Sequence, residues 1–278
     1  MKPDTLNGLL AIARRQFSDA GIETASLDAR LLVQAATGLS HENLIATPDR
    51  LVEPRVAAVF REYVERRLAR EPVSRILGQR EFYGRTFQVT PDVLDPRPDT
   101  EVVVGLALKH VQGGRFVDLG TGSGAIAITL CAENPDLSGL ATDISAAALA
   151  VAKVNAQAVG VAERLAFLQS NWLSGVTGTF DLIISNPPYI GSSENLPPEV
   201  RDFDPPQALF AGEDGLDAYR RISSGSHEQI TTKGIVVLEV GSTQAQAVSA
   251  IFGEAGFRLA DTAKDLSGHV RALAFRLL

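Results

Sequence analysis

A stretch near the middle of the chain, residues 180–190, constrains the fold more than any other part of the sequence. It starts with the apolar run Leu182 to Ile184, which is typical of a strand buried on both faces of a sheet. Asn186 and two adjacent prolines follow, and prolines have a fixed φ and no backbone N–H, so they cannot continue a central strand. We therefore expect the strand to end at Ser185 or Asn186, followed by a stiff loop. In a parallel sheet such a loop lies at the edge where α/β proteins bind ligands.

From about residue 113 onward, strand and helix patterns alternate with short links between them. This alternation predicts a mostly parallel, doubly wound sheet. The predicted strands are 115–119, 137–142, 165–169, 180–185, 234–240, 257–260 and 270–277, and the predicted helices are 101–110, 125–132, 145–159, 215–232 and 243–255.

The N-terminal part of the chain, residues 1 to about 70, has a helical pattern. Val56, Phe60 and Val64 recur at helical spacing and form one apolar stripe. Several residues fit helix ends: Ser26 and Ser40 are expected N-caps of helices 27–36 and 41–45, Gly38 a stop signal, and Pro54 a first-turn residue.

Prolines punctuate residues 71–100, and aromatic residues on both sides of Gly84 predict a short hairpin there. The sequence therefore predicts three parts, which are a helical domain (1–72), a β-hairpin linker (73–100) and an α/β domain (101–278).

The segment from Phe116 to Gly124 predicts a strand that runs into a glycine loop, where a ligand can approach the main chain. Asp143 ends the next predicted strand, where a carboxylate accepts both hydroxyls of a ribose. This loop also satisfies the dinucleotide fingerprint, so on this motif alone a nicotinamide oxidoreductase is an alternative. Asp118 disfavours that alternative, because its carboxylate suits a cationic ligand such as a sulfonium and repels a pyrophosphate.

The loop Asn186 to Tyr189 favours a reaction at a planar NH2 group. An amide or exocyclic amine nitrogen is a weak nucleophile, and two hydrogen-bond acceptors on its N–H groups favour a pyramidal nitrogen. The Asn186 side-chain oxygen and the Pro187 carbonyl provide two acceptors, and the prolines hold that carbonyl rigidly. The Tyr189 ring can cover the planar group. No strong base is needed, since the proton leaves after the methyl group has arrived.

The glycine loop, Asp143 and the Asn186–Tyr189 loop together resemble the S-adenosylmethionine-dependent amino methyltransferases, which act on DNA bases or on protein glutamine. The flanking segments 72–84, 89–101 and 208–217 resemble one branch of that group, the release factor glutamine methyltransferases (the PrmC/HemK family). Residues 169–172, 239–241 and 265–271 also fit this family's pattern. Two positions depart from it: Asp95 replaces an aliphatic residue, and Asn171 replaces a common acidic one.

The resemblance implies an N-terminal helical bundle, a β-hairpin linker and a Rossmann-like, seven-stranded methyltransferase domain whose last strand is antiparallel. It also implies methyl transfer from S-adenosylmethionine, which becomes S-adenosylhomocysteine, to the side-chain nitrogen (N5) of the Gly-Gly-Gln glutamine of class I peptide chain release factors. The implied catalytic residues are Asn186, Pro187, Pro188 and Tyr189. The implied cofactor-binding residues are Asp118, Gly120, Thr121, Gly122, Ser123, Gly124, Asp143, Asn171, Trp172 and Asn186, with no metal site.

In this family scheme the N-terminal domain docks the release factor. We expect a series of arginines to contribute to that surface, although interleaved glutamates also fit a solvated helix face. The series consists of Arg61, Arg66, Arg67, Arg70, Arg75, Arg80 and Arg85.

The overall composition narrows the remaining alternatives. A net charge of −7 and the absence of a target-recognition insertion argue against a DNA adenine methyltransferase, and we expect no stable nucleic-acid binding. The intact loops argue against a non-enzymatic binding module. No apolar run is long enough for a membrane helix, and Met1 to Asp4 do not resemble the start of a signal peptide. Cys131, the single cysteine, forms no internal disulfide. We expect a cytoplasmic monomer.

Overall fold

The computed structural model describes residues 4–278, so most of the Met1–Asp4 segment considered for a signal peptide lies outside the described residues. The chain divides into two compact units. The helical unit contains residues up to Gly78 together with Pro197–Phe203, and the α/β unit contains Gln79–Leu196 and Asp204–Leu278. Residues 197–203 follow the Asn186–Tyr189 loop, and no local sequence signal predicts that they group with the N-terminal helices.

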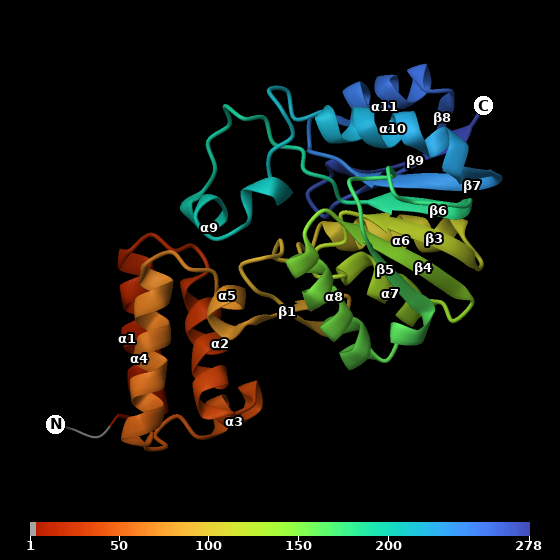
Figure 1. Cartoon of the computed structure of the whole chain (residues 1–278). Coiled ribbons are helices and arrows are strands. Elements are labelled where there is room, and N and C mark those ends of the chain that lie inside the picture. Colours follow the sequence, from red (N-terminus) through yellow and green to blue (C-terminus); the bar gives the residue numbers. More distant parts are fainter. Residues whose placement is uncertain (1–3) are drawn as a thin grey trace. The chain divides into compact units, whose positions relative to one another are not determined.

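The helical unit is built around one apolar core that includes Phe17, Leu32 and Phe60. Three predicted helix signals are confirmed: Ser40 Oγ accepts the Asn43 N–H, Gly38 ends its helix at a φ of 70°, and Pro54 occupies a first turn. Its helices are α1 (Leu6–Asp19), α2 (Ala25–Thr37), α3 (His41–Ala46), α4 (Pro54–Leu68), α5 (Val73–Leu77) and the short α9 (Pro198–Arg201) (Figure 1).

The predicted N-cap Ser26 is wrong, because α2 already begins at Ala25. The carbonyl of Thr24 accepts the Asp28 N–H at 2.9 Å and so closes the first helical turn. The Thr24 hydroxyl also donates to the Asp28 carboxylate at 2.8 Å. Asp28 in turn accepts a bond from Arg67 at 2.8 Å, so the start of α2 is tied to α4 by a buried ion pair.

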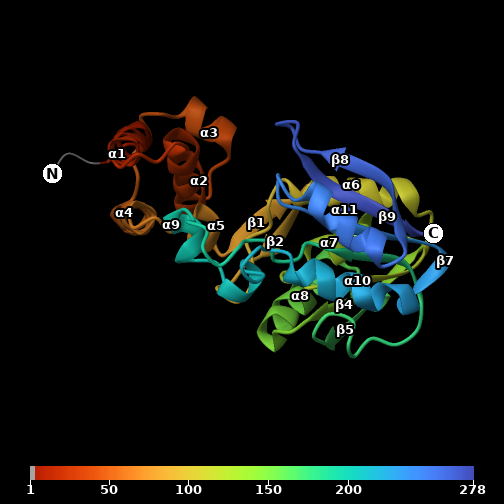
Figure 2. The same cartoon turned by 90° about the horizontal axis from the view of Figure 1, so that it is seen from above.

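The α/β unit begins with the predicted hairpin and continues into a seven-stranded sheet (Figures 1 and 2). The hairpin strands are β1 (Gln79–Phe82) and β2 (Arg85–Gln88). The sheet strands are β3 (Gly114–Leu119), β4 (Leu137–Asp143), β5 (Leu165–Gln169), β6 (Phe180–Ser185), β7 (Ile230–Glu239), β8 (Phe257–Lys264) and β9 (Val270–Leu277). The helices are α6 (Thr100–His110), α7 (Ala125–Glu133), α8 (Ala146–Val159), α10 (Asp217–Gln229) and α11 (Ala245–Glu254).

The spatial order of the strands is β5-β4-β3-β6-β7-β9-β8. Strands β3 to β7 are parallel, whereas β9 runs antiparallel to both of its neighbours, which confirms the predicted last strand. Other boundaries also differ from prediction. The strand expected to end at residue 260 continues as β8 to Lys264, because it pairs with β9 along this length. The helix expected to reach residue 232 ends at Gln229. Strand β7 starts at Ile230, because that residue already pairs with Phe180 of β6.

Both faces of the sheet are covered by helices. Alternate residues of β6 enter different cores, with Leu182 and Ile184 on one face and Ile183 on the other. The first core includes residues of α6 and α7, and the second includes residues of α10 and α11. Figure 1 shows these two pairs of helices on opposite sides of the strands. Burial on both faces explains the continuous apolar run that the sequence shows in β6.

Candidate active site

The carboxyl ends of β3, β4 and β6 meet at one edge of the sheet. The chain order reverses between β3 and β6, and an open α/β sheet binds its ligand at such a switch point. Asp118 is in register with Ile184 of β6, and the Ser185 hydroxyl donates to the Leu119 carbonyl at 2.6 Å. The glycine loop and the Asn186 loop therefore leave the sheet side by side.

The glycine loop needs its glycines for two different reasons. Gly120, Gly122 and Gly124 all have a left-handed φ, between 55° and 83°, which L side chains rarely adopt. A Cβ on Gly124 would also lie 2.7 Å from the Ile128 side chain, so packing of α7 requires glycine there. A Cβ on Gly122 would meet nothing within 4 Å, so the main chain at this point is open to a ligand.

Asp143 connects this loop to the next strand. Its carboxylate accepts the Gly122 N–H and the Ser145 N–H, both at 2.9 Å. A carboxylate has about four lone-pair positions, so roughly two stay available to further donors. Thus Asp143 holds the loop in shape and keeps unused acceptor positions, and its role in binding a ribose stays a prediction.

Asp118 lies within the protein and has no solvent-exposed surface. Burial raises the pKa of its carboxyl to about 7, and hydrogen bonds from the Thr121 hydroxyl (2.6 Å) and the Ala127 N–H oppose that rise. The charge of Asp143 raises the pKa further. In this position the Asp118 carboxylate holds the Thr121 hydroxyl. The expectation that Asp118 attracts a cationic ligand stays a prediction.

The other predicted cofactor residues have different surroundings. Ser123 is buried, and its carbonyl accepts the Asn155 side-chain N–H at 2.8 Å, so it holds α8 against the loop. Trp172 is half-buried with a φ of 53°, and its ring lies 3.8 Å from the position of a Cβ on Gly120. Asn171 is exposed. The structure thus brings Trp172 to the glycine loop and leaves the Asn171 side chain facing solvent.

The Asn186 side chain is held by its nitrogen end. Its Nδ2 donates to the Thr100 hydroxyl, at the start of α6, at 3.0 Å. With the nitrogen engaged, the amide oxygen Oδ1 is directed away from Thr100, as an acceptor for another N–H. Pro187, the next residue, is buried.

Tyr189 is fixed through its main chain. Its carbonyl accepts the Gln244 side-chain N–H at 2.8 Å, and a Cβ on Gly215 would lie only 2.3 Å from the same oxygen. Ile190 then forms a bridge to Phe210. Burial, and next the nearby Glu239, raise the pKa of the Tyr189 phenol to about 12, so this side chain is neutral at physiological pH and no base.

Four residues that support the loop were not picked out from the sequence as site residues, namely Thr100, Gly215, Glu239 and Gln244. Glu239 belongs to the segment 239–241 that fits the family pattern, but the pattern gives it no role in the site. Glu239 was detectable in principle, because it is a carboxylate at the end of a strand that is otherwise apolar.

The arginine series is occupied within the protein. Arg67 pairs with Asp28, Arg66 binds Glu71 with two nitrogens, and Arg70 lies 3.3 Å from Glu199 of α9. Three others pair with a carboxylate each, namely Arg61 with Asp4, Arg80 with Asp95 and Arg85 with Glu133. Arg75 is buried. These contacts help to hold the fold together, while Arg61, Arg66, Arg70 and Arg80 keep between 34% and 54% of their side chains exposed. Their contribution to a docking surface stays a prediction.

Asp95, which departs from the family pattern, is 2% exposed, and its carboxylate lies 4.0 Å from Arg80.

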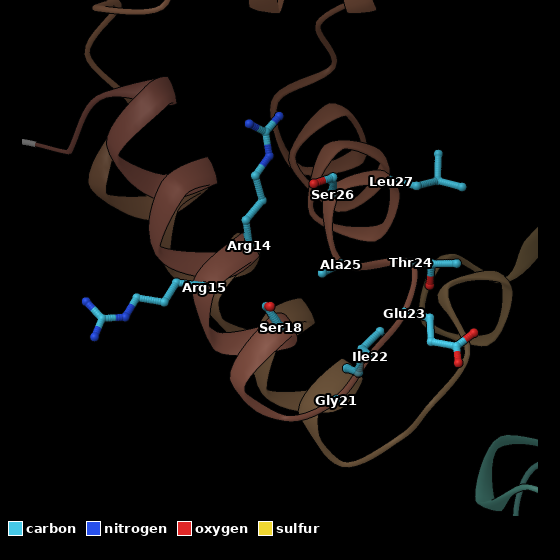
Figure 3. A pocket seen from close by; sticks show the side chains of 10 residues that line it. All are labelled: Arg14, Arg15, Ser18, Gly21, Ile22, Glu23, Thr24, Ala25, Ser26 and Leu27. Carbon is cyan, nitrogen blue, oxygen red and sulfur yellow. The ribbon is translucent and has the colours of Figure 1, made fainter.

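A pocket of about 780 Å³ lies within the helical unit, between the end of α1 and the start of α2 (Figure 3). Arg14, Arg15 and Ser18 line it from α1, and residues 21–27 from the other side. Figure 3 shows the Arg14 side chain extending towards α2, whereas that of Arg15 points away. The pocket contains none of the predicted site residues.

From residue 4 onward, the structure has no helix that is long and apolar enough to cross a membrane. Within the same residues, no cluster of His, Cys, Asp and Glu side chains is suited to a metal ion.

The strand order, the glycine loop with Asp143 and the stiff loop at β6 define an S-adenosylmethionine-dependent methyltransferase fold. The protein-family model of the methyltransferase small domain matches residues 99–197, and the family model of the PrmC N-terminal domain matches residues 8–78. A methyltransferase from Pyrococcus furiosus has the same fold, with a TM-score of 0.54 and 18% identity over 70% of this chain and 89% of that one.

Curated relatives identify the family. Release factor glutamine methyltransferase from Agrobacterium fabrum is 41% identical to this chain. The match covers 98% of this chain and 97% of that relative. The enzyme of the same name from Cereibacter sphaeroides is 45% identical, and the match covers 96% of this chain and 97% of that relative. This chain belongs to the release factor glutamine methyltransferase family. Family membership excludes the nicotinamide oxidoreductase as an account of the glycine loop.

Proposed function

We propose that this protein transfers a methyl group from S-adenosylmethionine to the side-chain N5 of the glutamine in the Gly-Gly-Gln motif of class I release factors, and so supports translation termination. Identity above 40% along nearly the whole chain, helical unit included, is the observation that carries this proposal. We propose further that the protein acts in the cytoplasm as a monomer, without stable nucleic-acid binding, and that the helical unit docks the release factor.

The residues of the glycine loop fit the proposed cofactor. Gly122 leaves the main chain open, Asp143 keeps acceptors for ribose hydroxyls, and the Trp172 ring borders the loop at Gly120. The buried Asp118 carboxyl adds negative potential when ionised, which favours a cationic ligand. When bound, S-adenosylmethionine supplies an electrophilic methyl group on a positively charged sulfur.

The Asn186 loop would orient the acceptor. Asn186 Oδ1 and the Pro187 carbonyl each accept one N–H of the glutamine amide, which turns the nitrogen lone pair towards the methyl group. The Tyr189 ring covers the planar amide. As the new N–C bond forms, the C–S bond breaks, and the proton afterwards leaves the nitrogen for solvent. The acceptors are held before the reaction begins, and this preorganisation lowers the barrier.

Transfer of a radiolabelled methyl group tests this proposal. Purified release factor, the same factor with its motif glutamine changed to asparagine, and duplex DNA serve as parallel acceptors. We expect label in the unchanged release factor alone. Label in DNA and none in the factor would overturn the proposal in favour of a nucleic-acid methyltransferase.

A further inference from the structure

One buried carboxyl group beside the Asn186 loop has no role in the mechanism described so far. Glu239 is the last residue of β7 and is 1% exposed. Ser185 pairs with Leu238, so Asn186 and Glu239 follow at the ends of adjacent strands. Its Oε2 atom has no hydrogen-bond partner among the described residues. An ionisable group that is buried in this way calls for a functional explanation.

Thr100 links this carboxyl group to Asn186. It is 4% exposed, and its hydroxyl accepts the Asn186 Nδ2–H at 3.0 Å. The amide nitrogen can only donate, so the hydroxyl proton of Thr100 stays available. Hydrogen bonding by that hydroxyl favours the ionised form of Glu239. The chain of donors therefore runs from Asn186 through Thr100 to Glu239.

We propose that Thr100 and Glu239 are positioning residues that set the orientation of the Asn186 amide, so that Oδ1 faces the acceptor nitrogen. Without them the amide can turn by half a rotation and present its NH2 group to the N–H of the acceptor. This inference rests on the proposed function in one respect, which is that Asn186 Oδ1 receives a bond from the target nitrogen.

The protonation state of Glu239 sets the direction in which the hydrogen bonds between Asn186, Thr100 and Glu239 are donated. Burial raises the pKa of Glu239 to about 7, and the negative charge of Asp99 also raises it. The hydrogen bond from Thr100 lowers this pKa, and the cations Arg271 and Arg97 lower it more weakly. Tyr189 and Tyr219 also face the group, and the Tyr219 hydroxyl donates to the Glu239 carbonyl at 3.0 Å. An ionised Glu239 only accepts, whereas a protonated one can donate to Thr100 and so favour the reversed amide.

The hydrogen-bond chain from Asn186 through Thr100 to Glu239, here called the relay, is tested by activity measurements on the complete enzyme at saturating cofactor. Thr100→Val removes the hydroxyl but keeps the shape, and we expect kcat to fall about 100-fold, as for loss of a preorganised catalytic contact. Thr100→Ser keeps the hydroxyl and should retain most of kcat. Calorimetry should show similar cofactor affinity in both variants. In an Asn186→Ala background, Thr100→Val should cause no further loss, because the residues act as a unit.

The pH profile provides the readout that a purely structural role would not change. Wild-type kcat should fall as pH drops below about 7, since protonation of Glu239 reverses the chain, and Glu239→Gln should abolish that dependence. A Thr100→Val enzyme with wild-type kcat, or fully additive losses with Asn186→Ala, would overturn the proposal. If Thr100→Val does not fold, Glu239→Gln and Thr100→Ser still decide it.

An NMR measurement separates failure of the relay from failure of the proposed function. The side-chain amide signal of Asn186, identified by its loss in Asn186→Ala, is observed without any acceptor. We expect it to shift with pH near 7 in the wild type and not in Glu239→Gln. If the signal changes neither with pH nor in Glu239→Gln, the positioning role of Thr100 and Glu239 is contradicted, whichever acceptor is methylated. If the release factor is not methylated, only the proposed function is contradicted.

Discussion

Replacement of Asp143 by alanine tests the proposed cofactor site most quantitatively. The structure assigns two of its lone-pair positions to the Gly122 and Ser145 N–H groups and leaves about two for ribose hydroxyls. Hydrogen bonds to a charged group contribute roughly 1.5–3 kcal/mol each, so the loss of two weakens cofactor binding by about 3–6 kcal/mol. This corresponds to a fall in affinity of roughly 10²- to 10⁴-fold.

The assay is isothermal calorimetry with S-adenosylmethionine, and Asp181→Ala is a matched control. Asp181 is also half-buried and accepts a main-chain N–H, from Arg115 at 2.9 Å, but it lies near the other end of β6. We expect Asp143→Ala to lose affinity as calculated and Asp181→Ala to keep it. Equal affinities in the two variants would refute the assignment of Asp143 to the ribose.

Three other predictions concern separate parts of the molecule. Asn186→Ala should lower transfer by about 10²- to 10³-fold while cofactor affinity in calorimetry persists; loss of both together would make Asn186 a binding or folding residue. Cofactor affinity should weaken by up to about tenfold per pH unit below the Asp118 pKa of about 7, because the neutral carboxyl no longer attracts a cation, and Asp118→Asn should abolish this slope. Asp28→Ala should lower the free energy of unfolding in urea by about 3–5 kcal/mol, since it removes the nearest carboxylate partner of the buried Arg67. A negligible loss would show that Glu199, 3.6 Å away, is a sufficient partner.

Much of the fold could be predicted from local sequence signals. Two adjacent prolines after an apolar run located the end of β6, and Gly38, Ser40 and Pro54 marked helix ends correctly. These signals work because proline, glycine and cap residues act on the backbone within a few positions. The start of α2 was misplaced, since the Thr24 carbonyl closes the first helical turn, whereas the prediction relied on the side chain of Ser26.

Contacts between distant segments could not be predicted in the same way. Nothing local indicates that Thr100 binds Asn186, that Gln244 holds the Tyr189 carbonyl, or that Arg70 is occupied by Glu199. The arginine series illustrates the problem, because a run of charges looks the same in sequence whether it faces solvent or is paired inside the fold. Strand order and helix packing decide between these outcomes.

The central claim is that the acceptor is the side-chain nitrogen of one glutamine. The most direct measurement is tandem mass spectrometry of a class I release factor after incubation with this protein and S-adenosylmethionine. The account predicts a single added methyl group on the N5 atom of the Gly-Gly-Gln glutamine, absent when Asn186→Ala replaces the wild type. A methyl group on any other residue, or an unmodified factor together with methylated DNA, would contradict it.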